Sequence, residues 1–444
     1  MAVDRISGVD QPFRLAAGVQ WLAYHLFSLE ALLVLFIFGH HLKAILPSPP
    51  LFPETVFYGA TSVAVGLWII LRQGIYLRGL PIVLAGLVFS GWMLASYAWS
   101  PSAVLARESL VYVLGINLWA LFVAACVVAA SRERMLRLLV LIVFFAVVLS
   151  VYGAYIEIVH GSFRFYRGEY GDWHFRTYLI WGNIVGPGTA ILMAMVIYTR
   201  LGSLKQLGAL GCFLVCMYFM LVCGPRGPVL GLLLAMVAFF VVNLPRIHGG
   251  RIELRYATLL GFVVIGGVLG YVAYLFATDQ VTATLGRFIQ LVEQADDPLL
   301  RRGANRFDYF AGAWRAWLEA PLFGHGLQAF ATVFCGFEDS GCHPHNALLQ
   351  ALADFGLIGF VLYVIFLWTA LRNFSLHRLR QDPLLTTLLM LFMMVTIYAL
   401  VHVNIPTDHR MFFYIGLLAL RPPPVEDDAE ETEDEEDEEE AYAF

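Results

Sequence analysis

The sequence predicts an all-α polytopic membrane protein with about twelve transmembrane helices and one large helical loop on the outer side. Of its 444 residues, 59% are hydrophobic and only 14% are charged, which lies outside the range of soluble domains. Apolar runs of about 20 residues, the length that crosses a bilayer, recur along nearly the whole chain. Basic residues gather on alternate connections between these runs, as they do in multi-pass proteins.

Twelve apolar runs qualify as candidate spans, with ends good to about 2–4 residues. They cover 18–38, 56–72, 80–98, 109–130, 136–158, 177–199, 206–223, 228–245, 256–277, 346–371, 384–402 and 408–420. The first run lacks a small-residue cleavage site, which predicts a retained helix and not a signal peptide. The first run also contains Glu30 and the last is short, so the count is least secure at these ends. The chain thus divides into helices 1–9 (1–277), an outer loop (278–345), helices 10–12 (346–421) and a tail (422–444).

The basic residues predict the orientation. With a cytoplasmic N-terminus, 16 of them fall on inside segments and 4 in short outside loops, namely Lys43, Arg107, Arg226 and Arg410. The positive-inside rule therefore places both termini in the cytoplasm. The other 8 are arginines in two longer outside loops, 159–176 and 278–345, and so many outside charges call for a function.

The net charge of −6 combines a strongly acidic tail with a basic remainder of the chain. The tail carries 13 acidic residues between Glu426 and Glu440, which leaves about +7 on the rest of the chain. A solvated, disordered extension is the simpler interpretation of this tail. A regulatory or partner-binding role stays open.

The six cysteines fall into two groups. Those within spans, Cys126, Cys212, Cys216 and Cys223, are expected to pack as small apolar residues. Cys335 and Cys342 lie in the large outside loop, where an oxidising compartment would let them form a disulfide. Zinc binding together with the nearby histidines is the alternative, although the spacing fits no standard zinc site.

The most informative stretch is Gly341–Gln350, which ends the longest polar segment. It places His343 and His345 at the start of the next apolar run. Ionisable side chains near lipid are costly and therefore indicate function.

An amphipathic helix is predicted just before this stretch, over 302–318. Phe310, Ala313, Trp314 and Trp317 repeat at helical spacing and would form its apolar face. Arg302 and Arg306 are four residues apart, so both could grip one anion. A helix lying on the membrane with its arginines toward headgroups is the alternative.

Two other outside arginines could likewise bind a ligand or contact lipid headgroups. Arg226 stands at the tip of the turn Gly224–Pro228, whose glycines and prolines leave room for a ligand. Arg176 lies where the smaller outside loop enters the sixth span, before Asn183 and Gly186-Pro187-Gly188. Either arginine could simply contact headgroups.

Several arginines with one or two histidines suit a diphosphate clamp with an adjacent base. Guanidinium groups bind phosphate bidentately, and an imidazole accepts a hydroxyl proton near neutral pH. No nucleotide-binding loop or acidic metal pair stands near the spans, so the expected chemistry uses neither nucleotide nor metal, and no cofactor is predicted.

The order of motifs resembles the shared core of the O-antigen ligase/polymerase superfamily. It consists of Arg306 and Trp314, the turn Pro321-Leu322-Phe323-Gly324-His325-Gly326, the pair His345-Asn346 and the run Gly356-Leu357-Ile358-Gly359, preceded by the Arg226-Gly227 turn. The resemblance covers about 176–360. Each motif is weak alone, and their order and spacing make the combination specific.

The length, the twelve spans and the single large loop look most like the ligase branch. The resemblance implies a GT-C-like fold and a metal-independent, inverting glycosyl transfer on the periplasmic face of a Gram-negative inner membrane. O-antigen would pass from undecaprenyl diphosphate to lipid A–core. His345, Arg226 and Arg306 match the family's residues, whereas Arg176 and Arg302 are looser assignments to the diphosphate and His343 has no clear counterpart.

Three alternatives remain from the sequence. An O-antigen polymerase would share the donor and the site and differ in its acceptor. A protein O-oligosaccharyltransferase generally has extra outside segments that this chain lacks. A lipid or sugar transporter would show repeated halves with broken helices and mid-span charges, and no internal repeat is seen. Membrane lipid is the other expected partner, and no nucleic acid is expected. The sequence does not predict the oligomeric state.

Overall fold

The fold is a helical bundle, as predicted, with one short hairpin. The computed structural model describes residues 24–42, 54–160, 177–199, 202–222, 226–244, 246–248, 251–253, isolated residues between 259 and 274, 306–372, 374–401 and 404–420. Within these residues, eight helices are long and apolar enough to cross a membrane, and two shorter apolar helices accompany them. The hairpin pairs β1 (Arg246–His248) with β2 (Arg251–Glu253) in antiparallel register.

The elements follow one another through the chain as listed here. The first half holds α2 (Leu29–Leu42), α3 (Glu54–Gln73), η1 (Leu77–Gly79), α4 (Leu80–Ala95), η2 (Ser96–Trp99), α5 (Val104–Val111), η3 (Tyr112–Ile116), α6 (Asn117–Val123), η4 (Ala124–Val128) and α7 (Arg132–His160). The second half holds α8 (Thr177–Tyr198), α9 (Leu204–Val222), α10 (Arg226–Val242), α13 (Arg306–Glu319), η7 (Ala331–Cys335), α14 (Ala347–Leu371), α15 (Leu376–Gln381), α16 (Pro383–Val401), η8 (Ile405–Thr407) and α17 (His409–Leu417). From α5 to η4 the helix is continuous, with two π-helical stretches.

Most predicted spans coincide with helices. The ranges 56–72, 136–158, 177–199 and 346–371 match α3, α7, α8 and α14 within a few residues. The range 408–420 does not form a single crossing helix. Its helix α17 has nine residues, about 14 Å of length against a hydrocarbon core of roughly 30 Å. The range 256–277 and the start of 18–38 fall almost entirely outside the described residues.

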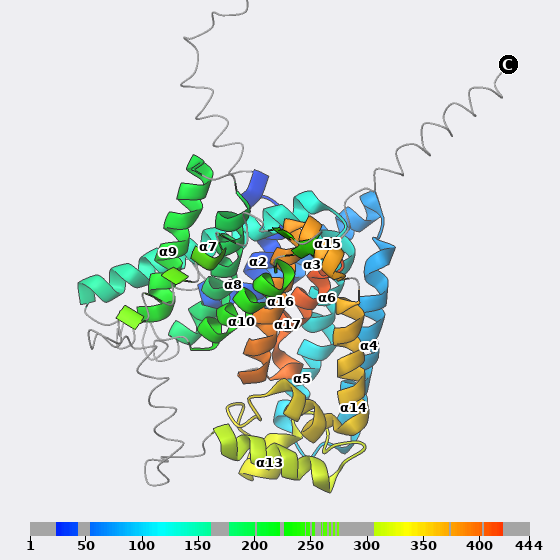
Figure 1. The fold of residues 1–444 in the computed structure, drawn as a ribbon. Coiled ribbons are helices and arrows are strands. Elements are labelled where there is room, and N and C mark those ends of the chain that lie inside the picture. The colour runs from blue at the N-terminus through cyan, green and yellow to red at the C-terminus, as the bar shows by residue number, and fades with distance from the viewer. Residues whose placement is uncertain are drawn as a thin grey trace, which may run out of the picture.

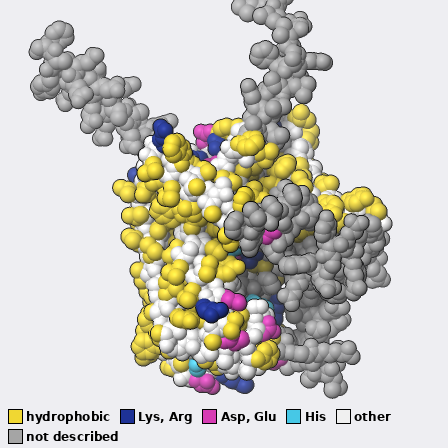
Figure 2. All heavy atoms as spheres, turned by 180° about the vertical axis from the view of Figure 1, so that it is seen from behind, with side chains coloured by type: hydrophobic (Ala, Val, Ile, Leu, Met, Phe, Trp, Pro, Cys, Tyr) yellow, Lys and Arg dark blue, Asp and Glu magenta, His cyan; other side chains and the backbone are white. Residues whose placement is uncertain are grey.

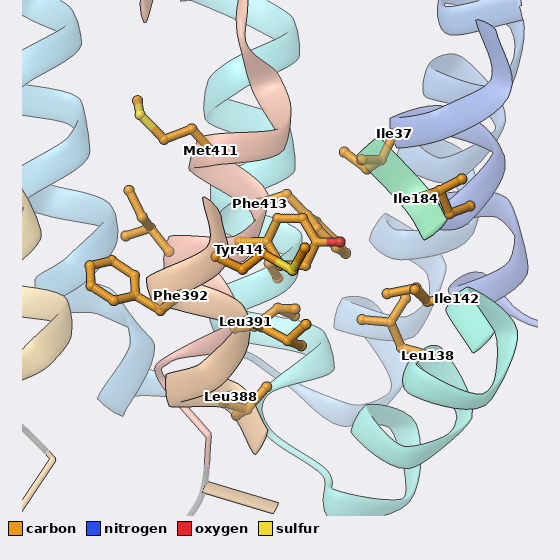
Figure 3. Packing of buried hydrophobic residues seen from close by; sticks show 14 of the residues in the cluster. Ile37, Leu138, Ile142, Ile184, Leu388, Leu391, Phe392, Met411, Phe413 and Tyr414 are labelled. Atoms are coloured by element: carbon orange, nitrogen blue, oxygen red, sulfur yellow. The ribbon is translucent and has the colours of Figure 1, made fainter. Parts of the chain in front are cut away.

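Small residues bring the helices into close contact, as is common in membrane bundles. Gly59 of α3 faces the ring of Phe36 on α2, and Gly231 of α10 lies against Met394 of α16. A side chain at either position would collide with its neighbour. The core between them is large and apolar. Figure 3 shows side chains of α2, α7 and α8 (Ile37, Leu138, Ile142 and Ile184) on the side facing α16 and α17, which contribute Leu391 and Tyr414.

The two ends of the bundle differ. The outer wall is mostly hydrophobic, with charged side chains gathered near its upper and lower ends (Figure 2). At the end that holds α15, Arg132 binds both carboxylate oxygens of Asp382 at 2.6 and 2.7 Å. At the opposite end, α13 lies across the bundle (Figure 1).

Helix α14 is broken, and the break holds a turn from another part of the chain. Gly356 has φ 67° and ψ −169°, which interrupts the helix after Phe355. The turn 321–326 enters this break and forms four backbone hydrogen bonds with residues 353–358. Gly324, also with positive φ, would place a Cβ 2.4 Å from the carbonyl oxygen of Asp354. The two glycine motifs therefore form one interlocked unit.

Two tryptophans of the α4 segment fasten this unit to the bundle. Trp92 donates from Nε1 to the carbonyl of Phe355 at 3.0 Å, and Trp99 donates to that of Gly324 at 3.3 Å. The ring of Phe323 stacks on Trp92 with centroids 5.9 Å apart. The outer layer is thus held against the membrane helices at a fixed position.

We expect Gly356→Ala to destabilise the protein. An added Cβ would lie 2.3 Å from the carbonyl oxygen of Leu322, and the positive φ disfavours any side chain. A loss on the order of 1–3 kcal/mol should lower the thermal midpoint in detergent by several degrees. Gly91→Ala on α4 is the control, because its Cβ would meet nothing within 4 Å. Equal midpoints for the two variants would contradict the interlock.

Candidate active site

A disulfide-closed loop forms one wall of the site. Cys335 and Cys342 are joined, so the disulfide interpretation is correct for these two residues. The bond removes the thiolates that a zinc site would need. The loop begins at η7, where Gly336 takes the left-handed conformation with φ 78°. It ends one residue before His343, so the disulfide fixes the approach to both histidines.

Glu338 anchors this loop to the membrane bundle. Its carboxylate accepts hydrogen bonds from the backbone N–H groups of Ala103, Val104 and Leu105, at the start of α5. Desolvation alone would raise the pKa of Glu338, but these hydrogen bonds outweigh it and hold the pKa below its usual value. The carboxylate is therefore ionised at neutral pH and caps the positive end of the helix.

Helix α13 forms as predicted, and Ala313 of the expected apolar face is buried, but the buried face is shifted toward the small residues. Gly312, Ala313 and Ala316 are buried, whereas Trp314, expected on the apolar face, is 48% exposed. The reason is close packing. A Cβ added at Gly312 would lie 2.3 Å from ring carbons of Phe334, so the ring can approach this closely only because residue 312 is glycine. A face of small residues approaches the layer beneath more closely than a face of tryptophans.

His345 is held in an unusual backbone conformation. Its φ of 54° lies in the left-handed region, which a non-glycine residue rarely adopts and which costs about 1–3 kcal/mol. The next residue, Asn346, is the N-cap of α14. Its Oδ1 accepts hydrogen bonds from the N–H groups of Leu348 and Leu349, both at 3.0 Å, and so caps the start of α14.

Other rings surround the His345 imidazole. The ring of Tyr309 on α13 meets it edge to face with centroids 5.4 Å apart, and that of His343 lies 3.9 Å away. His343 itself is within 3.2 Å of the carbonyl of Ser340 through Nδ1. The structure therefore brings the two predicted histidines together. By contrast, His325 contacts the carbonyl of Ala316 at 2.8 Å and ties the turn to α13.

Two of the four predicted arginines, Arg226 and Arg306, lie within described helices. Arg306 is the first residue of α13 and is exposed, one turn before Tyr309. Arg226 is the first residue of α10, so its position is a helix start and not the tip of a loop. Gly227 beside it faces the ring of Tyr398 at 3.4 Å, measured from an added Cβ. Arg176 and Arg302 lie outside the described residues.

A polar cavity of about 340 Å³ lies between the disulfide-closed loop and the membrane helices. Its lining is Leu105, Glu108, Ser109, Tyr112, Gln328, Ser340, His343, Asn404, Thr407, Asp408 and Arg410. Asn117, near the middle of the span Val104–Val128, donates to the carbonyl of Pro406 at 2.9 Å. This bond therefore ties the segment 404–410, which supplies four of the lining residues, to the middle of that span.

A chain of buried amides supports one side of this cavity. Gln328 donates to Ser109 at 2.8 Å and accepts from Asn404 at 3.0 Å. Gln350 then joins Asn404 to Asp354 at 2.8 and 3.2 Å.

Gln328 has φ 56°, so its backbone, like that of His345, lies in the left-handed region. Among the described non-glycine residues only these two have it, and strain of this kind concentrates at functional sites.

A buried ion pair closes the inner end. Arg410 binds Asp408 at 2.8 Å through Nε, and both residues line the cavity. Arg410 also hydrogen-bonds Tyr398, which bonds in turn to Asn183 of α8. A small hollow of about 30 Å³ on the far side is lined by these same groups and by Pro228 of α10. The pair thus lies between the polar cavity and the start of α10.

Sequence reasoning missed most of this lining. Arg410 was expected in a short outside loop, yet it stands near the start of α17 with its side chain only 19% exposed, because η8 and α17 pack against the bundle. The charged pair Asp408 and Arg410 at the edge of an apolar run was a usable signal. Gln328 and Asn404 gave no such signal, since their role depends on contacts between distant segments.

Comparison with known proteins gives a consistent result. A sequence profile of the family described as O-antigen ligase matches residues 189–364. An O-antigen ligase from Pseudomonas aeruginosa is 26% identical over 326 residues, which cover 70% of this chain and 69% of that protein. Arg226, Arg306 and His345 all fall within the profile match. Over these residues the chain is therefore similar to O-antigen ligases, and its helices of spanning length are those of a multi-pass membrane protein.

Proposed function

We propose that the protein is a glycosyltransferase that ligates O-antigen from undecaprenyl diphosphate onto lipid A–core. The observation that carries this proposal is the polar cavity beside His343 and His345, within the segment that matches the ligase family. A site of this kind, at the outer end of a membrane bundle, is reached by two lipid-anchored substrates from the bilayer. It needs no soluble carrier for either.

The reaction is a direct displacement at the anomeric carbon of the lipid-linked sugar. His345 accepts the proton of an acceptor hydroxyl as its oxygen bonds to that carbon. The bond between the carbon and the diphosphate oxygen breaks at the same time, and the diphosphate leaves with the electron pair. Attack from the opposite side inverts the anomeric configuration. No metal enters this scheme.

The arginines stabilise the departing diphosphate. Arg226 at the start of α10 and Arg306 at the start of α13 approach from different elements, and each helix start adds its own positive potential. Arg176 and Arg302 complete the clamp, and His343 supports it from beside the base. Their charges offset the negative charge that grows on the leaving group.

The disulfide supports a periplasmic site. Disulfides form in the periplasm and are rare in the cytosol. Helix α15, which carries Arg378 and Arg380, lies at the other end of the bundle from α13 (Figure 1), and Arg132 at the start of α7 binds Asp382 directly after it. The positive-inside rule favours basic residues at the cytoplasmic end. The protein then lies in the inner membrane with both termini in the cytoplasm.

We expect His345→Asn to lower the rate of glycan transfer by roughly 10²–10⁴-fold, the usual contribution of a general base. Asparagine tolerates the left-handed backbone, so the fold and its thermal midpoint should survive. The assay follows transfer from lipid-linked glycan to lipid A–core by the purified protein.

His377→Asn is the control, because this exposed histidine lies on α15 at the opposite end of the bundle. A near-normal rate for His345→Asn would remove the base assignment. Longer lipid-linked chains with untouched lipid A–core would instead identify a polymerase.

We expect Arg226→Ala and Arg306→Ala each to weaken binding of the lipid-diphosphate donor by about tenfold or more, because charge-assisted bidentate contacts are lost. Lysine replacements should recover only part of the affinity, since they keep the charge and lose the planar fork. Arg315→Ala is the matched control on the exposed side of α13. Retained donor affinity in both alanine variants would rule out the clamp.

We expect Cys335 and Cys342 to resist thiol alkylation in intact cells. After denaturation without reductant they should stay unmodified, whereas Cys126 and Cys216, which are free in the structure, should react. Peptide mass spectrometry with and without reductant gives the answer. Full alkylation of Cys335 and Cys342 without reductant would contradict a periplasmic loop.

A further inference from the structure

We propose that the cavity beneath the disulfide-closed loop is the acceptor subsite, and that it binds an unphosphorylated sugar unit through Glu108. This inference rests on the proposed glycosyl transfer and deepens it, because it assigns the cavity to the acceptor and not to the diphosphate donor. Four observations carry it, and they rest mainly on lining residues other than His345, Arg226 and Arg306.

The first observation is a polar stripe on one helix. Leu105, Glu108, Ser109 and Tyr112 all line the cavity, and their spacing places them on one face of the helix that begins at α5. Three of the four offer polar atoms. This face is turned toward the cavity and away from lipid, although the span around it is strongly apolar.

The second observation is the balance of donors and acceptors. Across from the stripe stand the amides of Gln328 and Asn404 and the hydroxyl of Thr407. Amides and hydroxyls both donate and accept, and the Glu108 carboxylate accepts twice. Sugar hydroxyls also donate and accept, so neighbouring hydroxyls of one ring match this lining.

The third observation is the charge of the lining. Glu108 and Asp408 contribute two negative charges and Arg410 one positive charge, which Asp408 already binds at 2.8 Å. The lining is therefore net negative when His343 is neutral. A diphosphate would be repelled at Glu108, whereas a neutral polyol would not.

The fourth observation is rigidity and size. The amide chain from Ser109 through Gln328 and Asn404 fixes the lining before any ligand arrives. The volume of about 340 Å³ lies near the lower limit of small-molecule sites, roughly 300–1,000 Å³. This suits one sugar unit and not a length of polysaccharide.

Steady-state kinetics test the assignment with purified full-length protein, lipid-linked O-antigen and lipid A–core. We expect Glu108→Ala to raise the apparent KM for lipid A–core by roughly 10- to 100-fold, the usual effect of losing hydrogen bonds to a charged group. The KM for the donor should change by less than about twofold. Glu108 is exposed to solvent, so the variant should fold normally.

Two comparisons sharpen the result. Glu108→Gln keeps the shape and one acceptor oxygen, and should lie between wild type and alanine. Glu319→Gln removes an exposed carboxylate from α13, outside the cavity lining, and should leave both KM values unchanged. An unchanged acceptor KM in Glu108→Ala, or an equal rise in both KM values, would overturn the acceptor assignment while the ligase function stood.

A binding measurement separates the two proposals. The probe is the water-soluble oligosaccharide obtained by deacylating lipid A–core, observed by saturation-transfer NMR without any donor. Binding by wild type that is lost in Glu108→Ala supports the subsite even if no transfer is detected, in which case the proposed function fails alone. Equal binding by both proteins, or no binding by wild type, would overturn the subsite.

Discussion

The backbone interlock between the turn 321–326 and the break at Gly356 is the constraint on which the site depends. A membrane helix normally satisfies all of its own hydrogen bonds, and a break leaves carbonyl and N–H groups unpaired. Here the turn supplies their partners. The interlock requires three glycines with positive φ, Gly324, Gly326 and Gly356, and it fixes the turn and α13 to the bundle. The capped start of α14, and His345 with it, takes its position from this unit.

The interlock also separates the motifs that are structural from the residues that we assign to chemistry. The turn 321–326 and the run 356–359 are structural, because their glycines allow backbone to approach backbone. Asn346 is a helix cap. The residues to which we assign chemistry are His345, the arginines of the two helix starts and the cavity lining. A motif comparison alone would weight all of these residues equally.

Charge is placed sparingly within this site. The buried Arg410 is paired with Asp408, and Asp354 is buried among hydrogen-bonding amide groups. Such arrangements keep polar groups inside a membrane bundle without unpaired charge. They also leave the cavity slightly negative and the helix starts positive. In the proposed reaction, this difference in charge would direct a neutral acceptor sugar to the cavity and the donor diphosphate to the helix starts.

The sequence by itself determined the membrane class, most helix positions and the meeting of His343 with His345. These follow from hydropathy and from local spacing, which act over one or two turns of helix. Only the tertiary structure decided that α13 buries its small residues, that Arg410 lies inside the bundle, and that Glu108, Gln328 and Asn404 share a cavity. Those features depend on contacts between separate segments, from Phe334 against Gly312 to the Asn404–Gln328 hydrogen bond across 76 positions. No local pattern encodes such a pairing, because its energy exists only once both segments have been brought together by the fold.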